Sequence, residues 1–191
     1  MGGILALDQA TKTGWAYAPF SAIKTWPFPL VPTMAMKPYG GIISGVADIG
    51  GKGLGVTHKG DKLRALITDL MTVHDVTHLY YETPLPAPAI RNSSTADLLR
   101  HLGNVIKDYP YPQGMRAQDV HNQSIKKFFA GTGRADKCAM MGVCERVAPR
   151  QLQDDNEADA IAVLIYAAQH IKDQVTERRR NRAILDAQRR A

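Results

Sequence analysis

Short apolar runs bounded by polar or glycine-containing turns recur along the first two thirds of the chain. Apolar runs of about four to eight residues with such boundaries are typical of β-strands. The first two runs are separated only by the polar stretch Gln9–Thr13, which predicts a hairpin. We expect five strands, at Ile4–Asp8, Gly14–Ala18, Gly41–Ala47, His78–Glu82 and Met115–Val120.

Apolar residues spaced three and four apart predict helices between and after these strands. Ser93 or Ser94 is placed to cap the second helix. Five prolines make 19–38 an irregular insertion, and the glycine-rich stretch 50–60 is expected to be a loop. The expected helices are Asp61–Val73, Ser94–Lys107, Asn122–Ala130, Ala135–Val147 and Glu157–Ile171.

The order of these elements indicates an α/β protein. An antiparallel hairpin followed by alternating strands and helices predicts a mixed five-stranded sheet with helices on both faces. A chain of 191 residues is long enough to form one domain with a proper core. We assign that domain to residues 1–171 and treat 172–191 as a basic C-terminal tail, either a charged helix or a disordered segment.

Positive charge is concentrated in this tail. The formal net charge is +6 and the pI is about 9.4, which favours an anionic partner. The tail holds seven basic and three acidic residues, a difference of +4, so the body is close to neutral. Cysteine and histidine show no zinc-site spacing, and no apolar run is long enough to span a membrane. We therefore expect a cytoplasmic protein without a membrane partner.

Acidic residues stand where predicted strands end and where the last helix begins. Asp8 ends the first strand and Glu82 ends the fourth, while Asp155, Asn156 and Asp159 share a face of the last helix. Neighbouring buried carboxylates stay ionised only if a cation neutralises them. Their oxygen atoms suit Mg²⁺ or Mn²⁺ rather than zinc. We predict that these five residues bind two such ions, about 3.5–4 Å apart, and that the four carboxylates are catalytic.

Each acid taken alone also has an ordinary structural explanation. Asp8 can cap the hairpin turn, and Glu82 can be an exposed residue before a proline-rich loop. Asp155 and Glu157 can be first-turn acids that the helix dipole favours. Only the joint placement of the acids favours a metal site.

Several segments together resemble the RuvC family of Holliday junction resolvases, within the RNase H-like nuclease superfamily. The resemblance extends over about residues 4–168. Its most specific part is a helix, a Gly-x-Gly turn and the start of a second helix. The matching segments are Ile4–Asp8 with Thr13–Ala16, Tyr80–Pro84, Glu157–Ala162 and Ile125–Lys137.

The resemblance implies an RNase H-like fold and a metal-dependent endonuclease, with two Mg²⁺ or Mn²⁺ ions, that cuts branched DNA. It further implies a homodimer that makes paired nicks at a four-way junction, with the helix 94–107 at the dimer contact. It assigns DNA binding to Lys126 and Lys137. Lys127 and Arg134 add basic charge beside them, and basic side chains bind phosphates independently of base sequence.

The chain departs from the family pattern at two places. The family has an acid or a histidine three residues before its last aspartate, where this chain has Asn156. Either Asp155 takes that role or Asn156 binds through its amide oxygen, and Glu157 is a weaker candidate because it points away from Asp159. The family can also carry an aromatic DNA wedge three residues after its second acid, where this chain has Leu85.

Three functions remain open at this point. The first is a resolvase of four-way junctions. The second is an RNase H-like nuclease of other specificity, acting on flaps, replication forks or RNA. The third is a catalytically inactive junction-binding module, which Asn156 makes plausible. The compact size, the divergent motifs and the basic tail suggest that the protein comes from a phage or prophage.

Overall fold

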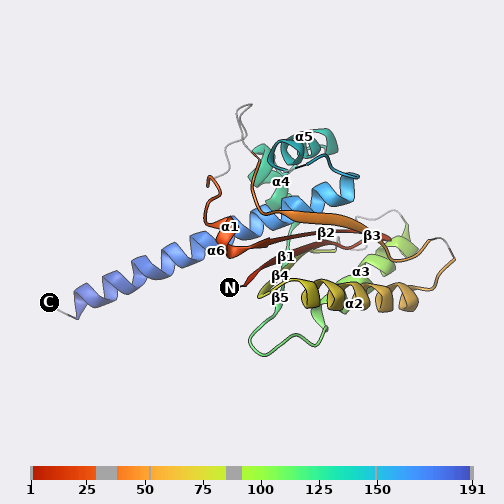
Figure 1. Ribbon diagram of the computed structural model, residues 1–191, viewed down its shortest axis with the longest axis horizontal. Coiled ribbons are helices and arrows are strands. Elements are labelled where there is room, and N and C mark those ends of the chain that lie inside the picture. The colour runs from red at the N-terminus through yellow and green to blue at the C-terminus, as the bar shows by residue number, and fades with distance from the viewer. Residues whose placement is uncertain (1, 29–37, 52, 85–91, 149, 190–191) are drawn as a thin grey trace.

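A single mixed sheet forms the centre of the protein (Figure 1). The computed structural model describes residues 2–28, 38–51, 53–84, 92–148 and 150–189. The strand order is β3-β2-β1-β4-β5; β2 pairs antiparallel with β1 and β3, and β4 pairs parallel with β1 and β5. The strands are β1 Gly3–Asp8, β2 Lys12–Pro19, β3 Ile43–Asp48, β4 His78–Glu82 and β5 Ala117–Val120. The predicted five strands and mixed sheet are confirmed.

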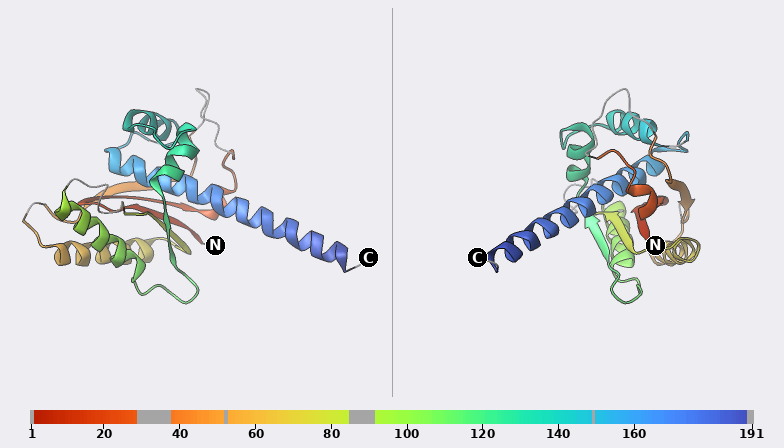
Figure 2. Two further views of the ribbon diagram at one scale, coloured as in Figure 1. Left: turned by 180° about the vertical axis from the view of Figure 1, so that it is seen from behind. Right: turned by 60° about the vertical axis from the view of Figure 1, so that its left-hand side comes forward.

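Helices cover both faces of the sheet, as Figures 1 and 2 show: α4, α5 and α6 lie on one face, and α2 and α3 on the other. The short helix α1 follows β2. The helices are α1 Phe20–Ile23, α2 Val56–Val73, α3 Ser93–Lys107, α4 Asn122–Ala130, α5 Lys137–Val147 and α6 Asp155–Gln188.

Each strand serves two cores because its side chains alternate between the faces of the sheet. In β1, Ile4 and Ala6 pack toward α4, α5 and α6, whereas Leu5 and Leu7 pack toward α2 and α3. Tyr80 in β4 faces the same core as Ile4. The side of the sheet that a strand-end residue faces therefore follows from its position along the strand.

The observed helices differ from the sequence-based expectations at several places, and the helix expected from Ala135 begins at Lys137. The helix expected from Asp61 begins at Val56, inside the stretch expected to be a loop. Most glycines of that stretch precede Val56, and only Gly60 lies within the helix. Asn92, rather than Ser93 or Ser94, caps α3 by accepting a hydrogen bond from the Ser94 amide, 3.0 Å long. The insertion 19–38 contains α1, and its residues 29–37 lie outside the described part.

The last helix is much longer than expected. α6 passes through the predicted boundary at residues 171 and 172 without a break. Its sequence after Glu157 contains no glycine or proline, and arginine, alanine, leucine and glutamine are good helix formers. Among the described helices, none is both long and apolar enough to cross a membrane.

Candidate active site

Asp8 and Glu82 end two parallel neighbouring strands. The register pairs Leu7 of β1 with Tyr81 of β4, one residue before each carboxylate. By strand alternation Asp8 lies on the same side as Ile4 and Ala6, the side that α6 covers. Glu82 lies on that side for the same reason, and both carboxylates therefore point toward the start of α6.

The first turns of α6 bring Asp159 to these strand ends. The Asp154 carboxylate caps the helix by accepting from the amides of Asn156 and Glu157, at 3.0 and 3.2 Å. Asp159 then lies one turn into the helix, opposite Asp8 and Glu82. The pocket between these elements has a volume of about 220 Å³ and is lined by Asp8, Gln9, Ala10, Glu82, Thr83, Pro84, Leu99, Lys137, Asn156 and Asp159.

The three carboxylates destabilise one another's ionised forms. Burial, followed by the charges of Asp159, Glu82 and Asp155, raises the pKa of Asp8 well above its ordinary value. Burial also raises the pKa of Glu82 and of Asp159, although Asn122 and nearby lysines partly offset it. A cation among them would remove this cost.

Asp155 takes a different position from the other acids. Its carboxylate forms an ion pair with the Lys137 ammonium group at the start of α5. This hydrogen bond lowers the pKa of Asp155, and the side chain is 46 % exposed. Asn156, in contrast, lines the pocket beside Asp159, and its amide nitrogen donates to the Asp154 carboxylate at 3.2 Å. Of the two candidates for the fourth ligand, Asn156 lines the pocket, whereas Asp155 does not line it and is paired with Lys137.

Two amide side chains at the site were missed by the sequence analysis. Gln9 follows Asp8 and is only 4 % exposed; its nitrogen donates to the Glu82 carbonyl, and its Oε1 is buried without a hydrogen-bond partner among the described residues. Asn122, the first residue of α4, donates to Glu82 Oε1 at 2.8 Å. A polar residue directly after a strand-end aspartate was the only available signal for Gln9.

The donor set fits a hard divalent cation. Asp8, Glu82 and Asp159 supply carboxylate oxygens, and Gln9 Oε1 is a buried acceptor in need of a partner, all in one pocket. In the described part of the chain, no three acidic, histidine or cysteine side chains already converge closely enough to hold an ion. Small side-chain rotations would therefore accompany metal binding.

A partly buried ionic network fixes the start of α6 to the edge strand β3. Glu157 is 0 % exposed, as expected for a side chain facing away from Asp159. Its carboxylate accepts from the Ser44 hydroxyl at 2.7 Å, from the Gln153 amide at 2.6 Å and from the Arg150 guanidinium group. Arg150 also donates to the Ser44 carbonyl at 2.7 Å. Glu157 therefore anchors the start of α6 to β3.

Gly14 of β2 allows the same helix start to approach the sheet. A Cβ atom at this position would lie 1.9 Å from the Asn156 carbonyl oxygen, far inside van der Waals contact. Only glycine leaves room for this approach. The backbone of Asn156 is thus held against β2 while its side chain lines the pocket.

The residues predicted to bind DNA differ in how close they lie to the pocket. Lys137 lines it, and Lys126 is close enough to lower the pKa of both Glu82 and Asp159. Lys127 and Arg134 are exposed near the turn between α4 and α5 and do not line the pocket. That turn begins at Gly131, whose φ of 72° favours glycine. Leu85 lies outside the described residues.

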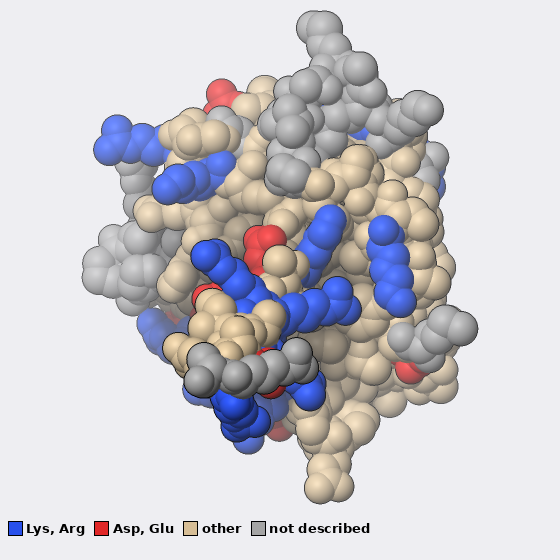
Figure 3. Space-filling model, turned by 90° about the vertical axis from the view of Figure 1, so that its left-hand side faces the viewer, with Lys and Arg blue, Asp and Glu red and all other residues tan. Residues whose placement is uncertain are grey.

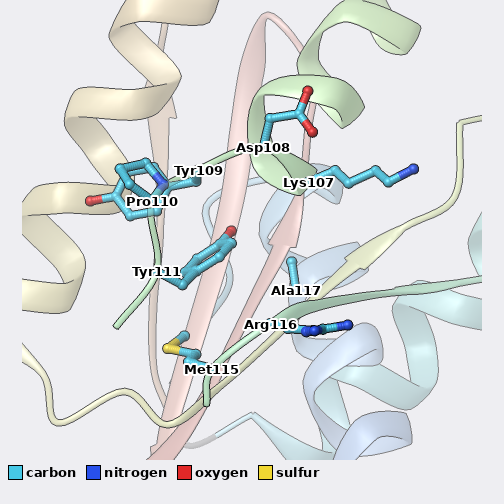
Figure 4. A pocket seen from close by; sticks show the side chains of 8 residues that line it. All are labelled: Lys107, Asp108, Tyr109, Pro110, Tyr111, Met115, Arg116 and Ala117. Atoms are coloured by element: carbon cyan, nitrogen blue, oxygen red, sulfur yellow. The ribbon is translucent and has the colours of Figure 1, made fainter. Parts of the chain in front are cut away.

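A wider depression of about 590 Å³ lies at the opposite end of the sheet, where β5 begins (Figure 4). It holds no comparable chemistry. The Tyr111 hydroxyl already donates to the Ile106 carbonyl at 2.7 Å, and the Tyr109 hydroxyl is 2.8 Å from Thr68 Oγ1. The lining residues are Lys107, Asp108, Tyr109, Pro110, Tyr111, Met115, Arg116 and Ala117.

At the level of sequence, no protein-family model and no curated protein matches this chain. Solved structures do match it. RuvC from Thermus thermophilus aligns with a TM-score of 0.65 at 12% identity, covering 90% of this chain and 96% of RuvC. The same enzyme in complex with a Holliday junction substrate aligns at 0.67 and 12%, covering 91% and 97%. The yeast mitochondrial Holliday junction resolvase Ydc2 aligns at 0.50 and 10%, covering 87% and 78%. At these identities the likeness is one of architecture, and the chain has the RNase H-like fold of the RuvC resolvases.

Proposed function

We propose that this protein is a metal-dependent endonuclease that cuts branched DNA and resolves four-way junctions. The observation that carries the proposal is the meeting of Asp8, Glu82 and Asp159 in one pocket beside Lys137. The RuvC fold supports it, since the T. thermophilus enzyme of that fold has been solved with a Holliday junction substrate. Carboxylates that raise one another's pKa are typical of metal-dependent phosphodiester chemistry.

The pocket residues divide into metal-holding and substrate-holding groups. Asp8, Glu82 and Asp159 would hold Mg²⁺ or Mn²⁺, with Asn156 or Asp155 completing the set. When bound, such ions supply Lewis acidity at the scissile phosphate. Gln9 and Asn122 orient the Glu82 end of β4 through their hydrogen bonds to its carbonyl and carboxylate.

The lysines give the site its preference for a polyanion. Lys137 is 77 % exposed, and its ammonium group can exchange Asp155 for a DNA phosphate without leaving the pocket rim. Lys126 stands on the α4 side of the same pocket. Together they position a phosphodiester over the carboxylates, and contacts of this kind carry no base specificity.

Paired symmetric nicks require two copies of the pocket, so the proposal includes a homodimer. The resemblance to the RuvC family implies a dimer contact on the helix that forms α3. Leu102 of that helix is buried in the core with α2 and does not belong to a contact surface. Leu99 lines the pocket and must stay accessible to the substrate, so Leu98, which is partly exposed although it packs against the same core, is the more suitable residue for a second copy to cover.

The test is cleavage of a synthetic four-way junction in Mg²⁺ or Mn²⁺, compared with a linear duplex, a flap, a replication fork and an RNA–DNA hybrid of equal length. We expect the junction to be nicked symmetrically and the linear duplex to be spared. Asp8→Asn should abolish cleavage and retain junction binding, whereas the matched surface variant Asp69→Asn should cut normally.

Other outcomes identify the alternatives. Equal cleavage of junction and linear duplex would contradict junction selectivity. Preferred cleavage of the flap, the fork or the hybrid would indicate an RNase H-like nuclease of other specificity. Metal-independent junction binding without cleavage of any substrate would indicate the inactive binding module, for which Asn156 in an acidic position is the supporting observation.

A further inference from the structure

The C-terminal part of α6 projects from the body of the protein (Figures 1 and 2). Every residue from Val175 to Arg189 is exposed, in contrast to the buried run Ala160–Ile165 on the same helix. At 1.5 Å per residue the exposed segment is about 21 Å long. We call residues 175–189 the projecting segment.

The projecting segment is rich in unpaired positive charge. Figure 3 looks onto this end of the molecule and shows lysine and arginine side chains gathered around it. Within the described residues, none of its arginines forms an ion pair or a side-chain hydrogen bond. The acidic residues of the segment are Glu177 and Asp186 alone. The arginines are Arg178, Arg179, Arg180, Arg182 and Arg189.

Three of these arginines share one face of the helix. Arg178, Arg182 and Arg189 are spaced by four and seven residues, which places them in one stripe. Like charges at this spacing destabilise an isolated helix, and the exposed segment gains little tertiary packing to compensate. A polyanion bound along the stripe would remove the repulsion.

The apolar residues of the segment do not form a seam for a second helix. Val175 and Ile184 are nine residues apart and therefore lie on opposite faces, and Leu185 is adjacent to Ile184. A coiled coil needs apolar residues repeating every three and four positions along one stripe. The stripe that the segment does have is basic, so its charge fits nucleic acid better than a second copy of the chain.

We propose that the projecting segment binds the phosphate backbone of duplex DNA that flanks the cleavage point, an inference that rests on the proposed function. Arg178 is 19 residues beyond Asp159, so the contact begins roughly 29 Å along α6 from the pocket. At 3.4 Å per base pair this corresponds to about eight base pairs of duplex. Such a contact is independent of base sequence and anchors one arm of the substrate.

The test uses the full-length triple variant Arg178→Gln, Arg182→Gln, Arg189→Gln in Ca²⁺ or EDTA, with binding measured over a range of salt concentrations. For junctions with long arms and for a long linear duplex, we expect binding about tenfold weaker. The slope of log K against log salt should become less steep by about two to three, close to 0.9 per lost phosphate contact. A junction with arms of about six base pairs, closed by hairpin loops, should bind both proteins equally, because it ends before the stripe.

A control variant removes the same charge elsewhere. Lys62→Gln, Arg64→Gln, Lys107→Gln also changes the net charge by three, at exposed positions of α2 and α3, on the face of the sheet opposite to α6 (Figure 1). An equal loss of affinity in this control would overturn the proposal, because the effect would then reflect net charge. An unchanged salt slope in the arginine variant would overturn it as well, and so would a change in oligomeric mass, which would identify a protein contact.

Failure of the proposed function would look different. If the wild type cut no branched DNA, the arginine variant would still lose affinity and salt dependence on the long linear duplex. The linear duplex thus tests the segment independently of cleavage.

Discussion

The two ends of α6 are held in place by different forces. At its start, Asp154 caps the helix, Glu157 is buried in a network with Ser44 and Arg150, and Gly14 admits the backbone close to β2. At its end, residues 175–189 are all exposed, and the helix continues there mainly through its own backbone hydrogen bonds. The same helix is therefore positioned by tertiary contacts where carboxylates must meet, and by local propensity where the surface is basic and open.

The two ends of α6 also differ in how accurately they must be positioned. Chemistry at the pocket tolerates only small displacements of Asp159, because misplacement of a catalytic group by about 1 Å can cost a hundredfold in rate. Phosphate binding along a helix tolerates larger shifts because each contact is electrostatic and independent of base sequence. Substitutions at the two ends should consequently affect different observables.

The largest effect is expected from removing a charge at the buried end. Asp159→Asn should lower the single-turnover cleavage rate on the order of a thousandfold or more, since it removes a carboxylate that opposes the cation's charge. Junction affinity should change little. Arg182→Gln at the other end should show the reverse: cleavage at saturating DNA unchanged and affinity reduced. Similar rates for Asp159→Asn and wild type would remove Asp159 from the site.

The next effect concerns folding stability. Glu157→Ala should lower the free energy of unfolding by about 2–4 kcal/mol, because it leaves the Ser44 hydroxyl and the Gln153 amide without their acceptor, while the half-exposed Arg150 can be solvated by water. Glu177→Ala on the exposed part of α6 should stay within about 0.5 kcal/mol of wild type. Urea denaturation measures both. Equal losses would mean that the network contributes nothing beyond helix formation.

A smaller loss is expected from crowding the helix start. Gly14→Ala places a methyl group against the Asn156 carbonyl and should cost about 1–3 kcal/mol. It should also reduce the cleavage rate of the folded protein, since α6 must move away from β2. The control Gly142→Ala has free space inside α5 and should be neutral or stabilising by up to about 1 kcal/mol. Normal cleavage by Gly14→Ala would show that the close approach is not required.

The smallest effect is an increase in the free energy of unfolding, expected when the negative charge of Asp8 is removed. Because burial and neighbouring acids raise the pKa of Asp8 in the folded state, the protein is most stable with Asp8 protonated and loses that stability as pH rises through the folded pKa. Without divalent cations, Asp8→Asn should therefore be more stable at pH 7, by on the order of 1 kcal/mol. The difference should shrink toward about pH 4. Mg²⁺ or Mn²⁺ should stabilise the wild type and not the variant; thermal unfolding with and without EDTA measures both.

The strands and the carboxylates were predictable because both leave a local pattern. Apolar runs identified all five strands, and an acid at the end of a run fixed the positions of Asp8 and Glu82 relative to the sheet. Asp159 followed from helical spacing ahead of Ile161–Ile165. The RuvC-like architecture came from the resemblance of these segments, and the structural comparisons confirm the fold.

The anchoring contacts were not predictable because they join residues far apart in the chain. Ser44 and Glu157 are 113 positions apart, and no sequence pattern near either residue predicts their contact. Gln9 and Asn122 support Glu82 across separations of 73 and 40 positions. The full length of α6 was missed for a different reason: its charged half has no apolar face, and an apolar face is what periodicity detects.

The parallel pairing of β1 with β4 has a consequence for synthesis of the protein on the ribosome. Glu82 can join Asp8 only after the intervening α2 has been made and the crossover between the two strands has closed. Asp159 arrives 77 residues later still, at the start of a helix that must dock onto the completed sheet. Nascent chains and prematurely terminated fragments that stop before residue 159 carry at most two of the three carboxylates. A pocket with all three carboxylates therefore forms only after nearly the whole fold has assembled.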